Sequence, residues 1–192
     1  LDHGQRQIDS VPVLLEKCLA QVSDLSRQVL AVVGLLALAP FGRESIAPAL
    51  GLPSSQLHKP LGELVSYGLL LRGGQWYEVS HALVHRFARE RRLAPDGTLE
   101  RLADYFIDLV RKQEQGWHDN LEMDAARPHI MAISSQLEEQ NAWELVVELA
   151  HLVTRSRGEG YLQVRGFWSD EEEHLNRAID ACGPLMKEAG VR

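Results

Sequence analysis

The sequence has little cysteine, no long apolar run and no secretory signal. Its two cysteines, Cys18 and Cys182, lie far apart, and neither has the neighbouring Cys or His residues that a metal site requires. This usage argues against a disulfide-stabilised secreted domain, and we expect a reduced chain in the cytoplasm. The longest apolar run, residues 29–39, is interrupted only by Gly34. It is too short to span a bilayer, so we expect a core helix and no membrane partner.

The sequence also lacks the short motifs that carry catalysis. It contains no Gly-x-x-x-x-Gly-Lys-Ser/Thr loop for nucleotide phosphates, and no Ser-His-Asp or Cys-His set at a familiar spacing. The run Glu171-Glu172-Glu173 has no partner acid. We interpret it as the solvated start of a helix, where the helix dipole favours carboxylates. We therefore expect that the chain is not an enzyme on its own and holds no cofactor by itself.

Charge is divided unequally along the chain. Residues 1–95 contain 10 Lys and Arg against 8 Asp and Glu, whereas residues 96–192 contain 10 against 19. Clustered cations are needed to bind phosphate backbones, so nucleic acid is not an expected partner of the acidic second half. The chain begins at Leu1 without an initiator Met, and we expect it to be part of a longer protein.

Residues 13–79 show the pattern of a winged helix. Apolar residues recur with a helical period over residues 13–22, 25–38, 44–50 and 55–67. Two β-type runs, 69–72 and 75–79, then flank Gly73-Gly74, which is a two-residue hairpin signal. Pro40 and Gly42 predict a turn at the end of the second helix. Helices followed by a hairpin in this order predict a winged-helix domain.

From Ser80 onward the pattern is helical throughout. We expect helices over residues 80–93, 99–115, 120–139, 142–155 and 170–181, with a further segment at 161–167. Pro95-Asp96-Gly97 marks a break. The predicted fold class is therefore mainly α. A winged-helix domain with an N-terminal linker helix is expected at residues 1–95, and antiparallel helical hairpins like those of tetratricopeptide repeats (TPR-like) at residues 96–192.

Several short segments, taken in order, carry a resemblance to a known family. They are Leu25 to Leu30, Leu64-Val65, Gly68-Leu69-Leu70, Tyr77, His81, Leu83-Val84, Phe87-Ala88 and Glu90-Arg91. This order resembles the winged helix of STAND ATPases, the NB-ARC-like signalling switches. Farther along, Arg165 to Asp170 resembles the Arg-Gly-x-Trp-x-Glu hairpin of the helical repeats that often follow, in which the Trp packs between helices.

The resemblance implies a regulatory role tied to a nucleotide. In that family a winged-helix His contacts the phosphate of bound ADP and holds the switch off, and His81 occupies the matching position. Ser80 and Ala82 stand where the family motif has Met and Asp. An imidazole at a helix N-terminus can donate an N–H to an anion. ATP or ADP, and the nucleotide-binding domain as a partner, are then expected N-terminal to Leu1. The helical domain is expected to bind a protein or a small ligand.

Two patterns in the predicted helix over residues 80–93 allow more than one interpretation. His81 and His85 lie four residues apart and could bind a metal ion, but no third ligand accompanies them. A basic cluster could contact phosphates or form a solvated helix face with cations near its C-terminus. The cluster comprises Arg86, Arg89, Arg91 and Arg92. We retain Arg86, Arg89 and Arg92, together with Trp168, as a candidate interaction surface.

The alternative function is a DNA-binding regulator that uses the winged helix directly. The recognition helix would be the one over residues 55–67. Its outward candidates are Gln56, His58, Lys59, Glu63 and Ser66. One Lys and one Glu form a poor electrostatic surface for a major-groove reader, so we prefer the regulatory function. Trp117, Trp143 and Trp168 are expected to pack between helices rather than form a ligand cage.

Overall fold

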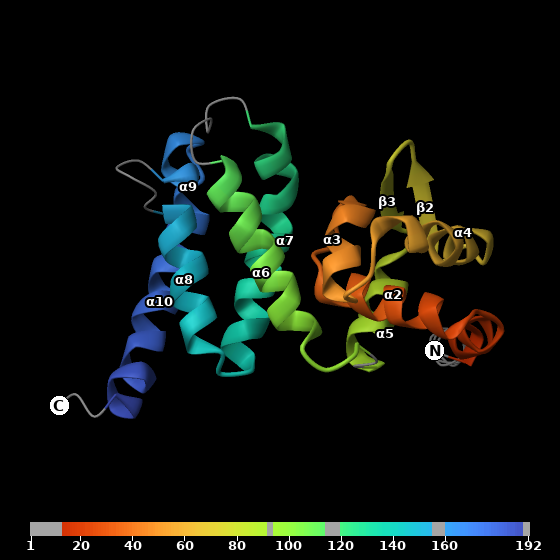
Figure 1. Ribbon diagram of the computed structural model, residues 1–192, viewed down its shortest axis with the longest axis horizontal. Coiled ribbons are helices and arrows are strands. Elements are labelled where there is room, and N and C mark those ends of the chain that lie inside the picture. The colour runs from red at the N-terminus through yellow and green to blue at the C-terminus, as the bar shows by residue number, and fades with distance from the viewer. Residues whose placement is uncertain (1–12, 92–93, 114–119, 155–159, 190–192) are drawn as a thin grey trace, which may run out of the picture. The chain divides into compact units, whose positions relative to one another are not determined.

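The helical content expected from the sequence dominates the computed structural model, which describes residues 13–91, 94–113, 120–154 and 160–189 (Figure 1). A small antiparallel sheet accompanies the helices, so the predicted mainly α fold class with a short β-hairpin is confirmed. The chain divides into two units, Leu1–Thr98 and Leu99–Arg192, where the sequence predicted a boundary between residues 95 and 96. No helix within the described ranges is long and apolar enough to cross a membrane.

The first unit combines helices with three short strands in the order of a winged helix. Its helices are residues 13–21, α2 (Asp24–Leu35), α3 (Arg43–Ala49), the 3-10 helix η1 (Ser54–Leu57), α4 (His58–Ser66) and α5 (Ala82–Arg91). Its strands are β1 (Phe41–Gly42), β2 (Leu70–Gly73) and β3 (Trp76–Val79). The sheet order is β1-β3-β2, and both pairs are antiparallel. The hairpin loop is Gly74-Gln75 rather than the predicted Gly73-Gly74, because Gly73 pairs with Trp76.

Strand β1 was not expected, since the sequence predicted only a turn between Pro40 and Gly42. In the structure Phe41 pairs with Tyr77 and Gly42 pairs with Trp76. The Phe41 and Tyr77 rings stack with their centroids 6.1 Å apart, and both are buried. A strand of two residues is too short to show a period of two, and only its distant partner strand defines it.

Helix α2 forms the centre of the first unit because apolar side chains surround it. Ser23 caps its N-terminus by accepting a hydrogen bond from the Ser26 backbone amide. Gly34, near its C-terminus, permits a close approach of α5. A Cβ atom at Gly34 would lie 2.7 Å from the Arg89 backbone nitrogen and 2.8 Å from the Ala88 carbonyl carbon. The glycine is therefore required by packing, although it interrupts the apolar run.

The second unit consists of helices that run beside one another, coloured green to blue in Figure 1. They are α6 (Thr98–Gln113), α7 (Leu121–Glu139), α8 (Trp143–Thr154), α9 (Tyr161–Val164) and α10 (Trp168–Glu188). Helix α8 packs against both α7 and α10. Within the described ranges no strand follows Val79. Helices α7, α8 and α9 thus pack against their neighbours along the chain, and the TPR-like hairpin arrangement stays a prediction.

Helix α10 is longer than the sequence predicted. The expected range was 170–181, but the helix continues through Gly183 and Pro184 to Glu188. Proline removes one backbone hydrogen bond and usually ends a helix. Here the backbone hydrogen bonds resume beyond it, where the Ala189 amide donates to the Leu185 carbonyl. The same tolerance occurs in α7, which contains Pro128.

Ion pairs connect α7 to α9 and α10 along one seam. The pairs are Arg127–Asp170, Arg165–Asp124 and Arg177–Glu138. The Tyr161 hydroxyl also donates to Asp124 over 2.8 Å, and the Arg127 guanidinium lies 4.1 Å from the centre of the Phe167 ring. The charged side chains of these three ion pairs are mostly buried. The attraction within each pair is therefore screened less by salt than it would be at an open surface.

His174 lies in the middle of this seam and is buried. Its Nδ1 is 3.4 Å from the Ser134 hydroxyl, and its Nε2 has no hydrogen-bond partner among the described residues. Protonation would place a charge where water is excluded and next to Arg177. Burial first, and Arg177 second, lower the pKa of His174 to about 4, while Asp170 acts in the opposite direction. The ring is therefore neutral at physiological pH.

Replacing Gly34 with Ala is expected to destabilise the first unit. The added methyl would meet the Arg89 backbone, and overpacking of this kind costs about 1–3 kcal/mol. This outweighs the roughly 1 kcal/mol by which Ala is favoured over Gly inside a helix. Gly62→Ala in α4, where nothing lies within 4 Å, is the matched control and should be neutral or stabilising. Hydrogen exchange of the α2 amides measures the stability of both variants. Equal stabilities of Gly34→Ala and Gly62→Ala would contradict the close approach of α5 to Gly34.

Acid is expected to destabilise the second unit through His174. Its folded pKa of about 4 lies below the ordinary 6.5, so the unfolded chain binds the proton more readily. The full stability is present above about pH 6.5 and is lost as the pH falls toward 4, by up to about 3 kcal/mol. Hydrogen exchange of α10 amides between pH 7 and 4.5 compares the wild type with His174→Gln. The variant should lose less stability on acidification, and an identical pH slope would contradict this role.

Candidate functional site

His81 lies at the N-terminus of α5, directly before its first residue. Its carbonyl accepts a hydrogen bond from the Val84 amide over 2.9 Å. Its Nδ1 accepts one from the Leu83 amide over 3.1 Å. Because Nδ1 is an acceptor, the neutral ring carries its proton on Nε2. The side chain is exposed, so His81 caps the helix and can still donate a hydrogen bond outward.

The residues on either side of His81 fix its position and leave it accessible. Ser80 donates to the Leu69 carbonyl from both its amide and its hydroxyl, each over 3.1 Å. These bonds attach the end of β3 to the start of β2. Ala82 is exposed and adds no side-chain charge. The positive end of the α5 dipole also lies here, so the geometry suits contact with an anion.

His85, one turn along α5, has a structural contact instead of a ligand-binding one. Its Nε2 lies 2.8 Å from the Leu36 carbonyl, just past the end of α2. This bond holds α5 against α2 and engages one of the two ring nitrogens that could bind a metal ion. Within the described part of the chain, no group of three His, Cys, Asp or Glu side chains could hold a metal ion. The structure therefore gives no support to a His81–His85 metal pair.

The arginines of α5 do not act as one phosphate-binding cluster. Arg86 lies 3.7 Å from Glu90, and Arg91 pairs with Glu16 of the helix over residues 13–21. Arg89 is exposed and its backbone packs at Gly34. Arg92 lies outside the described residues. The interpretation as a solvated helix face with local ion pairs fits Arg86 and Arg91 better than a phosphate surface does.

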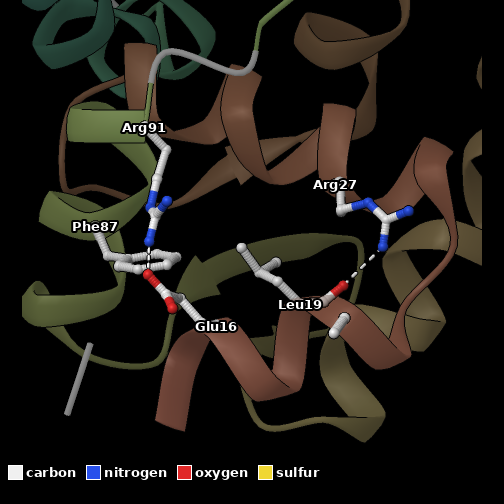
Figure 2. A pocket seen from close by; sticks show the side chains of 6 residues that line it. Glu16, Leu19, Arg27, Phe87 and Arg91 are labelled. Carbon is white, nitrogen blue, oxygen red and sulfur yellow. Dashed lines mark hydrogen bonds and ion pairs between the residues drawn. The ribbon is translucent and has the colours of Figure 1, made fainter. Parts of the chain in front are cut away.

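Arg91 also borders a hollow between the helix over residues 13–21, α2 and α5 (Figure 2). Its volume is about 220 Å³, and its lining residues are Glu16, Leu19, Ala20, Arg27, Phe87 and Arg91. At one side the Arg91 guanidinium lies 5.1 Å from the centre of the Phe87 ring. At the other, Arg27 donates to the Leu19 and Val22 carbonyls, each over 2.8 Å. Both guanidiniums are engaged in contacts within the unit. These contacts hold the helix over residues 13–21 in place, and they do not present free cations to the hollow.

The candidate recognition surface on η1 and α4 differs from the sequence prediction at one residue. Gln56, His58, Lys59 and Ser66 are exposed as expected. Glu63 is instead turned toward the N-terminus of α2. Its carboxylate accepts hydrogen bonds from the Ser23 amide (3.1 Å), the Ser23 hydroxyl (2.6 Å) and the Ser26 hydroxyl. These bonds lower the pKa of Glu63. Glu63 therefore joins α4 to α2 and is not an outward residue of this surface. Lys59 is the one lysine or arginine of α4 and gives the surface little positive charge.

Trp168 in the second unit departs from the expected packing between helices. The family-like hairpin predicted that it packs between helices, but it is 60% exposed. It is the first residue of α10, and most of its surface is open to solvent. Trp143 is half-buried, and Trp117 lies outside the described residues. Exposure leaves Trp168 available as part of an interaction surface.

No family model, no curated protein and no solved structure matches the chain.

The Glu16–Arg91 pair is expected to hold Arg91 weakly but measurably. Both side chains are about half exposed, so a double-mutant cycle with Glu16→Gln and Arg91→Gln should give a coupling energy of about 0.5–1 kcal/mol. Urea unfolding, monitored by hydrogen exchange at Trp76, measures this coupling energy. The Arg86–Glu90 pair, which is more exposed, is the control and should couple less. A coupling of zero for Glu16 and Arg91 would mean that Arg91 is available to another anion.

Proposed function

We propose that this chain is the regulatory portion of a nucleotide-dependent signalling switch of the STAND type. Its winged helix restrains an ATPase core that lies elsewhere in the full-length protein, and its helical unit binds a protein or ligand. ADP bound to that core is the ligand that His81 contacts. The chain itself contributes no catalytic group in this proposal.

One observation carries the proposal: His81 caps α5 through Nδ1 while its Nε2 remains free to donate. A phosphate oxygen is an acceptor, and a donor on a helix N-terminus is placed to bind one. The Asp of the family motif is replaced by Ala82, so the contact depends on the imidazole and the helix dipole without help from a carboxylate. Ser80 supports the ring by fixing the backbone at the end of β3.

The activation step follows from the same contact. Closure of the core onto the winged helix is favoured only while the phosphate accepts the His81 hydrogen bond. A hydrogen bond to a charged group contributes about 1.5–3 kcal/mol. Exchange or loss of the nucleotide removes this preference, and the two conformations then change in population. A partner on the second unit would bias the same equilibrium.

Two substitutions of His81 separate its capping role from its proposed phosphate contact. His81→Ala removes both, whereas His81→Asn keeps a good N-cap acceptor but is too short to reach the phosphate. In the full-length protein both variants should release ADP about tenfold faster or more, as expected for loss of a charged hydrogen bond. Only His81→Ala should also lose about 1 kcal/mol of stability in the first unit.

Release of a fluorescent ADP analogue from the full-length protein measures the first effect, and hydrogen exchange of the α5 amides measures the second. His58→Ala is the control, because His58 is an exposed histidine of the same unit that contacts Arg43. It should leave ADP release unchanged. If His81→Asn retained ADP as long as the wild type, the phosphate contact would be disproved even where His81→Ala was unstable.

A further inference from the structure

Helix α10 carries a row of exposed apolar side chains. Leu175 is 41% exposed, Ile179 is 67% exposed and Met186 is 49% exposed. The spacings of four and seven residues place them on one side of the helix. Scattered apolar residues are common at protein surfaces, but a row along one helix face indicates a surface that a partner covers.

A groove lies beside this row. It has a volume of about 620 Å³, and Val147, Ala150, His151, Thr154, Gln163, Glu171, Leu175 and Ala178 line it. These residues come from α8, α9 and α10 of the same unit. Leu175 belongs to both the groove and the exposed row, so the apolar row adjoins a groove of mixed polar and apolar lining. We call the two together the α10 surface.

The charge at the start of α10 indicates what kind of partner fits. Asp170 pairs with Arg127 and Glu173 pairs with Arg177. Glu171, which lines the groove, and Glu172 next to it have no ion-pair partner within the described ranges. The half of the chain that contains them is strongly acidic. Two carboxylates without an ion-pair partner among the described residues, next to the apolar row, match a partner that is apolar along one face and cationic at one end.

We propose that the α10 surface docks an amphipathic helix of a partner protein. The apolar face of that helix packs on Leu175 and Ile179, and its Lys or Arg side chains meet Glu171 and Glu172. A second copy of this chain fits less well, because pairing of the acidic surfaces would bring like charges together. This docking site would supply the partner class that the helical unit of the proposed switch binds. It rests on the proposed function only in assigning that unit to a signalling switch.

The test uses the 192-residue chain and two synthetic peptides of about 18 residues, or five helical turns. Both peptides carry the same leucine row, and they differ only in having Lys or Glu on the flanking positions. Fluorescence anisotropy at low salt measures binding. The Lys peptide should bind at least about tenfold more tightly than the Glu peptide, and Ile179→Asp should weaken its binding by a similar factor.

A charge reversal separates specific docking from general attraction to an acidic protein. Glu171→Lys with Glu172→Lys should reverse the preference, so that the Glu peptide binds more tightly. The matched control is Glu100→Lys with Asp104→Lys, a pair of exposed carboxylates on α6, and it should leave the preference unchanged. Absence of binding by both peptides, or an equal effect of the two double variants, would overturn the proposal. Either result would leave ADP release from the His81 variants unaffected, so the two proposals fail separately.

Discussion

The crossing of α2 and α5 at Gly34 is the contact on which the position of His81 depends. The backbone of Ala88 and Arg89 comes so close to Gly34 that no side chain fits between them. The hydrogen bond from His85 to the Leu36 carbonyl holds the same two helices one turn away. With α5 fixed at both points, its N-terminus and the His81 ring are placed by packing rather than by a loop. A residue in the core of the unit thus determines the orientation of an exposed one.

The order of helices and the hairpin could be predicted because each of these elements has a local signal. Apolar periodicity located α2 to α9 to within a few residues, and the glycine pair located the hairpin to within one residue. Strand β1 had no such signal, since two residues show no period. The length of α10 was wrong because Pro184 is normally a helix breaker. Propensity rules describe isolated segments, and here backbone hydrogen bonds beyond the proline preserve the helix.

The candidate site was less predictable than the fold because its decisive contacts join residues far apart in sequence. The position of His81 followed from the family-like motif, but the hydrogen bond from the Leu83 amide to its Nδ1, which sets the tautomer, required the structure. Glu63 could not be separated from the exposed face of α4, since its partners Ser23 and Ser26 lie on another helix. The same holds for Arg91 and Glu16. Trp168 was predicted to be packed, yet it is exposed because it begins α10.

Carboxylates in the second unit divide into two groups with different roles. Asp124, Asp170 and Glu138 pair with arginines along the seam and hold α7 against α9 and α10. Glu171 and Glu172 lie beside an apolar surface without such pairs. The first group joins helices within the unit, and removing one partner of such a half-buried pair would leave an uncompensated charge and destabilise the unit. In the proposed docking of a cationic amphipathic helix, the second group contributes to recognition instead.

Determination of the full-length polypeptide, with any residues that precede Leu1, tests the central claim most directly. Sequencing the gene and measuring the intact mass of the expressed protein would establish them. We predict a Gly-x-x-x-x-Gly-Lys-Ser/Thr loop after a predicted strand, followed by a strand that ends in acidic residues for magnesium. A full-length protein without a phosphate-binding loop would contradict the proposal that His81 contacts the phosphate of ADP.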